Sequence, residues 1–243
     1  VIDPPDTYRH GSSEAAGAGF LDQVRAAIAE IEASGDGFAG LIADTSFSSD
    51  GVFTGDAGMI TAAIDLVHAH GGVFIADEVQ PGFARTGEAF WGFQRHGLVP
   101  DLVTTGKPMG NGFPIAGLVA RREVLEAFSA HRPYFNTFGG NPVAIAAAQA
   151  VLDTIQNEGL QQHALEVGAE FRAALRALGS NHDVIGDVRG AGLYTGVELV
   201  QDRETKEPAT AAGLAVIENL RRRGVLTSVC GPGNNILKLR PPL

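Results

Sequence analysis

The chain has 243 residues, of which 44% are apolar, and a formal net charge of -10 at pH 7. This length and composition can bury a sizeable core, as one large domain or two smaller ones, and they exclude a disordered chain. The acidic balance disfavours a nucleic-acid partner, and no apolar stretch reaches the length of a membrane span. The single cysteine, Cys230, fits a reducing compartment. We therefore expect a cytoplasmic protein that binds neither nucleic acid nor membranes.

Strand-like apolar runs alternate with helical patterns along the chain, which predicts an α/β fold with a mostly parallel sheet. Apolar side chains recur at helical spacing between the first two runs and stop at a pair of glycines, so a crossover helix is expected over 58–70. The runs interpreted as buried strands are 38–43, 73–76, 102–105 and 115–119.

In the second half, Pro142 suits the first turn of a helix that runs to about residue 158, because its missing N–H costs nothing there. Further on, the pattern predicts a helix over 160–178, strands over 184–189 and 193–199, a helix over 210–223 and a strand over 236–239. This change to an α+β pattern predicts a large domain over 1–160 and a smaller domain over 161–243.

Two polar segments each follow a predicted strand. Asp77 closes the run 73–76, and Lys107 follows the run 102–105 inside a glycine-rich segment. In an open α/β sheet this edge is where ligands bind. An acid that can keep a pyridine nitrogen protonated and an amine that can form a Schiff base are the groups that pyridoxal phosphate chemistry requires. The sequence therefore predicts a pyridoxal 5'-phosphate site with Asp77 and Lys107 as catalytic residues.

A nucleotide hydrolase is the main competing interpretation, because its strands also end in acidic residues. A phosphate loop needs Gly, four residues and then Gly-Lys-Ser/Thr. Here Asp101 occupies the position of the first glycine and Pro108 follows the lysine. Taken alone, Lys107 is typical of a solvated loop lysine, but the glycines at 106, 110 and 112 allow a close backbone approach to a ligand.

A third segment, 136–142, places the Thr137 hydroxyl and two glycines just before a predicted helix N-terminus, where anions are favoured. In this order, segments 75–80, 82–87, 104–112 and 136–142 resemble the class III (ornithine aminotransferase-like) pyridoxal phosphate enzymes of fold type I. The resemblance extends over nearly the whole chain. It implies that 1–160 is part of the cofactor-binding large domain and that 161–243 is part of the C-terminal small domain.

The resemblance also implies roles for single residues. Asp77 would pair with the pyridinium nitrogen, Val79 would pack on a ring face, and Gln80 would bond the ring hydroxyl. Lys107 would form the Schiff base in a buried site, where nearby positive charge eases its deprotonation. Thr137 would reach the cofactor phosphate of the neighbouring subunit, which implies a homodimer with shared active sites.

The family's Gly-Ser phosphate loop and ring-stacking aromatic have no counterpart here, so we expect the chain to be an internal part of a longer enzyme. Lys238 stands where typical members carry the arginine that grips the substrate carboxylate, and Arg240 follows on the same strand face. Without the resemblance, both are more typical of sheet-edge charges. The usual glutamate gate is replaced by Asp44-Thr45-Ser46.

Segments 106–112, 208–210 and 235–242 resemble the ethanolamine-phosphate phospholyases and their alanine-glyoxylate aminotransferase-like relatives. This implies a small-molecule amine substrate, best a phosphorylated amino-alcohol whose phosphate Lys238 or Arg240 would hold. The favoured activity is β-elimination to ammonia, phosphate and an aldehyde. A class III aminotransferase is an alternative of nearly equal weight, and a non-catalytic truncated paralogue is a third.

No metal site is expected, since His68 and His70 lie two apart on a predicted helix and so on different faces. The run 221–223 is expected to complement a helix dipole. Arg189 fits either a strand-end ion pair or a substrate pocket, and the sequence leaves this open.

Overall fold

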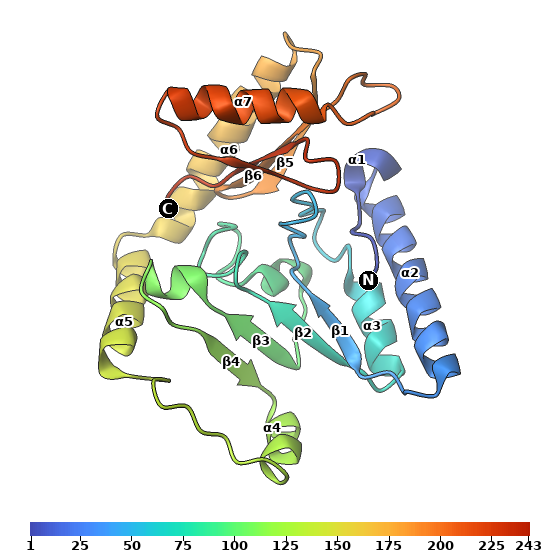
Figure 1. Ribbon diagram of the computed structural model, residues 1–243, viewed down its shortest axis with the longest axis vertical. Helices are drawn as coiled ribbons and strands as arrows, with labels where there is room; N and C mark the ends of the chain where they lie inside the picture. Colours follow the sequence, from blue (N-terminus) through green and yellow to red (C-terminus); the bar gives the residue numbers. More distant parts are fainter.

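A computed structural model describes residues 1–243 as two β-sheets with helices packed around them (Figure 1). The first sheet has the order β1-β2-β3-β4, and the second has the order β5-β6-β8-β7. The strands are β1 Gly40–Ala43, β2 Val73–Asp77, β3 Leu102–Thr105, β4 Gly117–Ala120, β5 Ile185–Ala191, β6 Tyr194–Leu199, β7 Ser228–Cys230 and β8 Ile236–Leu239.

Seven α-helices and two 3₁₀ helices surround the sheets. They are α1 Thr7–His10, α2 Ser13–Ser34, α3 Thr61–Ala69, α4 Arg122–Ser129, α5 Pro142–Asn157, α6 Leu160–Gly179, α7 Thr210–Arg222, η1 Gly92–His96 and η2 Lys107–Gly110. None of them combines the length and the hydropathy that crossing a bilayer requires. The predicted α/β class is confirmed, and the predicted strands and helices agree with the structure to within about three residues at each end.

The expectation for the fourth strand needs correction. Strand β1 pairs with β2 and β2 with β3 in parallel, but β4 runs antiparallel to β3 and begins at Gly117 instead of residue 115. It is also not the buried strand we expected, since Leu118 and Val119 are 58% and 67% exposed. The short connection after η2 explains the antiparallel direction, because a parallel strand would need a crossover of a dozen or more residues. Helix α2 and strand β7 are further elements that the sequence analysis did not predict.

Helices α2 and α3 cover one face of the first sheet and form the main hydrophobic core. Helix α2 buries Phe20, Val24 and Ile28, one side chain per turn on a single face. From β2 the core receives Phe74 and Ala76. Since successive strand residues point to opposite faces, the Asp77 side chain lies on the other face of the sheet. On that face Ile42 of β1 is 62% exposed, so the face is largely uncovered.

The second sheet presents two different faces. One packs on α6 and α7 through Val188, Val197 and Leu237, while Tyr194 and Ile236 on the other face cluster with Val52 from the loop after β1. The inner face of the second sheet therefore lies against the part of the chain that builds the first sheet. We call the part around the first sheet the first unit and the part around the second sheet the second unit. The two sheets lie on either side of residue 160 in the sequence; the domain division there, into 1–160 and 161–243, stays a prediction.

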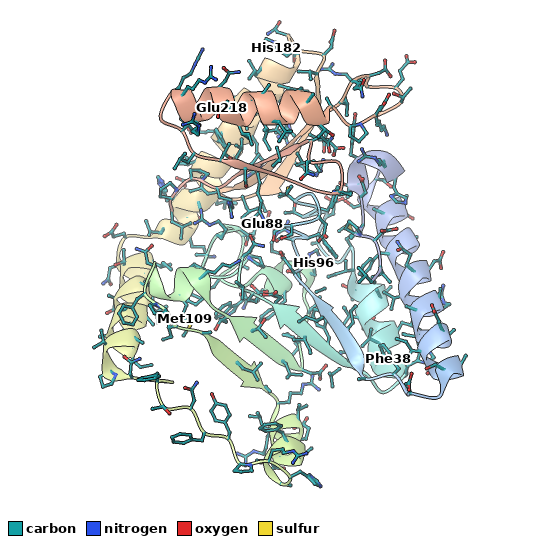
Figure 2. All side chains as sticks on the ribbon, viewed as in Figure 1. Phe38, Glu88, His96, Met109, His182 and Glu218 are labelled. Carbon is teal, nitrogen blue, oxygen red and sulfur yellow. The ribbon has the colours of Figure 1, made fainter.

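Polar contacts also join the two units. Arg189 donates from Nε and Nη2 to the carbonyl oxygen of Gly51, at 2.9 and 2.7 Å, and its guanidinium lies 4.3 Å from the Phe53 ring centroid. The same side chain pairs with Glu198 at 2.9 Å. Arg189 thus holds the two units together. Glu88, labelled in Figure 2 near the boundary between the units, pairs at 2.6 Å with Arg95 of its own unit.

Candidate active site

The fold brings the segments of Asp77 and Lys107 together. Asp77 is the last residue of β2 and is paired in register with Thr104 of β3, and Lys107 begins η2 directly after β3. A Cβ placed on Gly106 would lie 3.8 Å from Cγ2 of Val79. The segment that carries Lys107 therefore lies against the turn that follows Asp77, at the carboxyl ends of neighbouring parallel strands.

One of the two oxygens of the Asp77 carboxylate accepts hydrogen bonds from other residues of the chain. Its Oδ1 accepts from the backbone N–H of Val79 at 3.0 Å and from the Thr104 hydroxyl at 3.4 Å. Its Oδ2 accepts no hydrogen bond from the chain, and the residue is only partly buried. One carboxylate oxygen is thus held in place by its neighbour and the other is free for a ligand.

Lys107 is exposed, and its Nζ makes no hydrogen bond or ion pair within the chain. The expectation that it is buried is wrong for these 243 residues: helix α5 contacts η2, but the Lys107 side chain itself stays exposed. Its backbone has a φ of 32°, a strained value for a residue with a side chain. Such strain tends to persist at functional positions, where the surrounding structure holds it.

Gln80 of the first unit and Lys238 of the second unit both lie beside Tyr194. Oε1 of Gln80 accepts from the Tyr194 hydroxyl at 2.9 Å, and the Lys238 Nζ lies 5.8 Å from the centroid of the Tyr194 ring. Lys238 is 7% exposed, and its Nζ makes no hydrogen bond or ion pair within the chain. Burial is the main cause that lowers its pKa. The charges of Arg240 and Lys107 act in the same direction, whereas Cys230 and Asp44 act against it.

Two other predicted residues are placed differently. Arg240 is exposed and follows the end of β8. Thr137 is exposed. It belongs to the segment between α4 and α5, which lies at the edge of the molecule in Figure 1. The structure therefore brings Asp77, Val79 and Gln80 into one region with the Lys107 turn and Lys238, but it does not bring Thr137 there within a single chain.

Asp44, which we expected at the position of the gate glutamate, is held by its own turn. Its carboxylate accepts from the backbone N–H groups of Ser46 at 2.9 Å and Ser48 at 3.0 Å, and also from the Ser48 hydroxyl. Burial raises the pKa of Asp44, and the nearby Asp77 adds to the shift. An acid in this arrangement is not free to swing towards a substrate.

Glu78 is a buried residue that the sequence analysis missed. It is fully buried, and its two oxygens accept from the backbone N–H groups of Gly92, at 2.7 Å, and Phe93, at 2.8 Å. Burial raises its pKa to about 7. The alternation Phe74, Ala76, Glu78 would have placed it on the core face. It ties the turn after Asp77 to η1.

We expect Glu78→Gln to lower the free energy of unfolding by about 2 kcal/mol at pH 5, because the amide N–H₂ would face a backbone donor. Folded Glu78 binds its proton more tightly than unfolded Glu78, so its stabilising contribution falls as pH rises from about 4.5 to about 7. The deficit of the variant should therefore shrink over that range. Urea unfolding at several pH values measures it.

The matched control is Glu30→Gln, an exposed glutamate on α2. Its stability difference from wild type should stay within about 0.5 kcal/mol at every pH. A Glu78→Gln deficit that is constant, or that grows with pH, would contradict the assignment of a raised pKa.

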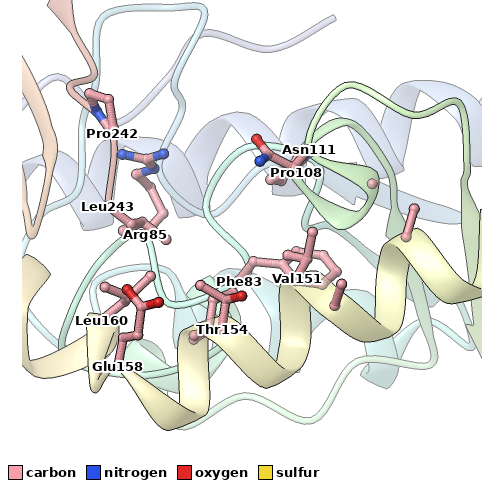
Figure 3. A pocket seen from close by; sticks show the side chains of 14 residues that line it. Phe83, Arg85, Pro108, Asn111, Val151, Thr154, Glu158, Leu160, Pro242 and Leu243 are labelled. Atoms are coloured by element: carbon pink, nitrogen blue, oxygen red, sulfur yellow. The ribbon is translucent and has the colours of Figure 1, made fainter.

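A separate cavity of about 510 Å³ lies behind the Lys107 turn, between η2, α5 and the loop around Phe83 (Figure 3). Its wall includes Phe83, Pro108 and Val151, with Arg85 and Glu158 on one side. Neither Asp77 nor Lys107 lines it. Arg85 is also engaged, donating to the carbonyl oxygens of Leu193 and Pro241.

The remaining candidates are engaged in separate contacts. His68 contacts Asp101 through Nε2 at 2.8 Å, and His70 contacts Glu32 through Nδ1 at 2.8 Å. At the end of α7, Arg221 and Arg222 both pair with Glu218.

A family model described as aminotransferase class-III matches residues 2–243. The chain belongs to the class III aminotransferase family. The predicted family and the fold type I architecture are thereby confirmed.

Several members of this family are similar to the chain. It is 41% identical over 232 residues to an ethanolamine-phosphate phospho-lyase homolog of Caenorhabditis elegans, covering 94% of the chain and 50% of that protein. It is 46% identical over 205 residues to a mitochondrial alanine–glyoxylate aminotransferase 2 homolog of Arabidopsis thaliana, covering 84% and 43%. The structure of a phospholyase from Arthrobacter in complex with phosphoethanolamine matches with a TM-score of 0.88 and 42% identity, covering 93% and 54%.

The chain thus spans about half the length of the family members it matches. These relatives include both a phospholyase and an aminotransferase at similar identity, so the family alone does not separate the two activities.

Proposed function

We propose that this class III chain belongs to a pyridoxal phosphate enzyme that removes phosphate and ammonia from a phosphorylated amino-alcohol such as O-phosphoethanolamine. One observation carries the proposal. Lys238 is a buried amine on the inner face of the second sheet, near Lys107, and no anion of the chain lies within ion-pair distance of it. A buried cation without a partner is costly, which suits a site that receives an anionic group.

The site residues fit the cofactor. Asp77 has a free carboxylate oxygen, Lys107 has a free amine, and both lie at the carboxyl edge of the parallel strands. In this proposal Asp77 holds the proton on the ring nitrogen, Val79 packs on the ring and Gln80 binds the ring hydroxyl. Pyridoxal phosphate, when bound, supplies an aldehyde that links to amines and a ring that accepts electrons.

In the elimination, Lys107 and the basic residues Lys238 and Arg240 have different roles. Lys107 Nζ takes the proton from the carbon that bears the amine. Lys238, with Arg240 exposed just beyond the end of the same strand, binds the substrate phosphate and stabilises it as it leaves with the electrons of the broken C–O bond. Addition of one water then releases ammonia and an aldehyde.

An aminotransferase is the second candidate, and the 46% identity to the Arabidopsis aminotransferase homolog favours it. Arg240 would then be free to bind a substrate carboxylate in two hydrogen bonds. The two activities share the proton transfer to Lys107 and differ in whether the substrate carries a leaving group on the next carbon.

We also propose that the enzyme is a homodimer with shared active sites. The segment 131–140, which carries Thr137, exposes three large aromatic side chains, Tyr134 at 77%, Phe135 at 85% and Phe138 at 81%. Neighbouring exposed aromatics are typical of a protein interface. A second copy seated there would bury them and bring Thr137 to the cofactor phosphate. Cytoplasmic location stays a prediction, and one relative is a mitochondrial protein.

The first experiment compares two assays of the purified enzyme with pyridoxal phosphate. One measures phosphate and ammonia release from O-phosphoethanolamine, and the other measures amino transfer from alanine to glyoxylate. Equal release of phosphate and ammonia without an amino acceptor supports the lyase. Amino transfer without phosphate release overturns it in favour of the aminotransferase, and neither activity in a colourless protein favours a non-catalytic paralogue.

For Lys238→Met we expect KM for O-phosphoethanolamine to rise about 10- to 100-fold, because a hydrogen bond to a charged group is worth about 1.5–3 kcal/mol. Inhibition by inorganic phosphate should weaken by a similar factor. Steady-state kinetics measure both. Lys206→Met, which changes a lysine that contacts Tyr8 instead, is the control. An unchanged KM for Lys238→Met would contradict the phosphate role.

A further inference from the structure

One hydrogen bond joins the two units at the candidate site. The Tyr194 hydroxyl, at the start of β6, donates to Oε1 of Gln80, in the turn after β2, at 2.9 Å. In the proposed function Gln80 binds the ring hydroxyl of the cofactor, and Tyr194 has no role. The partner of a cofactor-binding side chain controls where that side chain points.

The second sheet holds Tyr194 in a fixed place. The residue is 2% exposed, and its ring clusters with Val52, Cys230 and Ile236. The preceding Leu193 N–H donates to the Arg85 carbonyl oxygen at 3.1 Å, so the backbone before the strand is also anchored to the first unit. Burial raises the pKa of Tyr194 to about 12. The hydroxyl therefore keeps its proton and remains a donor at neutral pH.

This donor has a consequence for the Gln80 amide. An amide side chain carries an acceptor oxygen on one side and two N–H donors on the other. With Oε1 occupied by a hydroxyl donor, Nε2 points the other way. Its one contact within the chain is a long one, 3.4 Å to the Ser49 hydroxyl oxygen. Nε2 therefore has donor capacity left for a ligand.

We infer that Tyr194 is a positioning residue that fixes the Gln80 amide, so that Nε2 is presented as a donor to the ring oxygen of the cofactor. The inference rests on the proposed function, because it assigns Tyr194 through the role that the proposal gives to Gln80. The Lys238 Nζ lies over the ring of Tyr194. Tyr194 therefore contacts both Gln80, on the cofactor side of the site, and Lys238, on the substrate side.

The test introduces Tyr194→Phe into wild-type protein and into a Gln80→Ala background. In the wild-type background, we expect pyridoxal phosphate to dissociate about 10-fold more readily, and the pH midpoint of its visible absorbance to shift. In the Gln80→Ala background the second substitution should change neither quantity. In cofactor-free protein, NMR should show the Gln80 side-chain amide resonances shifted by Tyr194→Phe.

Tyr8→Phe is the matched control, because the Tyr8 hydroxyl is buried without a hydrogen-bond partner on α1. It should alter none of the three readouts. Equal effects of Tyr194→Phe in both backgrounds, or no effect in either, would overturn the inference while leaving the proposed function intact. A wild-type protein that never acquires cofactor absorbance would overturn both, and the assay of phosphate release would then also be negative.

Discussion

Lys107→Ala is expected to abolish the covalent link to the cofactor and to reduce phosphate release by at least about 10³-fold. Removing a positioned proton-transfer group costs about 10²–10⁴ in rate, and the loss of covalent attachment adds to this. The chain contains three lysines, Lys107, Lys206 and Lys238. Borohydride reduction followed by peptide mass spectrometry therefore identifies the attached lysine directly, because each alternative lies in a different peptide.

The control for this substitution is Lys206→Ala. Lys206 donates to the Tyr8 carbonyl oxygen at 2.8 Å and packs over the Tyr8 ring, in the part of the second unit that contacts α1. The control protein should keep its colour and activity. Retained visible absorbance and activity in Lys107→Ala, or a reduced adduct found on Lys206 or Lys238, would refute the assignment of Lys107.

Asp77→Asn is expected to lower the rate about 10²- to 10⁴-fold while leaving the fold intact. The asparagine Oδ1 can still accept from the Val79 N–H and the Thr104 hydroxyl, so the local hydrogen bonds survive. The group that replaces the free Oδ2 is an N–H₂ donor, which cannot hold a proton on the ring nitrogen. Removing one partner of such a charged pair costs about 3–5 kcal/mol.

The measurement combines kinetics with the pH dependence of the cofactor spectrum, because loss of ring protonation changes the spectrum even where activity is low. Asp65→Asn, on the exposed side of α3, is the control and should behave as wild type. If Asp77→Asn kept more than about a third of the wild-type rate with an unaltered spectrum, then Asp77 would not be the partner of the ring nitrogen.

Much of the fold could be read from local pattern. Strands β1, β2 and β3 are short apolar runs bounded by polar or glycine-rich segments, and α3 shows helical spacing between two of them. Helix α2 was missed although its buried side chains Phe20, Val24 and Ile28 follow helical spacing. The direction of β4 depends on the length of one connection, which an apolar run does not encode.

Some features of the candidate site were predictable from the sequence, and others required the structure. The positions of Asp77 and Lys107 at one edge of the sheet were predictable, because parallel strands place their carboxyl ends together. Their catalytic roles stay a prediction. The burial of Glu78 follows from strand alternation, yet its partners Gly92 and Phe93 lie on a 3₁₀ helix that the pattern did not reveal. The role of Arg189 also required the structure, because its acceptor, the Gly51 carbonyl, lies 138 residues away.

The sequence by itself therefore determined the family, the parallel strand edge and the two residues expected to do the chemistry. Only the tertiary structure decided that Tyr194 binds Gln80, that Lys238 is buried against Tyr194 with no anionic partner, and that Lys107 and Thr137 stay exposed. The physical reason is distance along the chain. Local periodicity reports which face of an element is buried, whereas these contacts arise from the packing of two sheets whose relative placement no local pattern specifies.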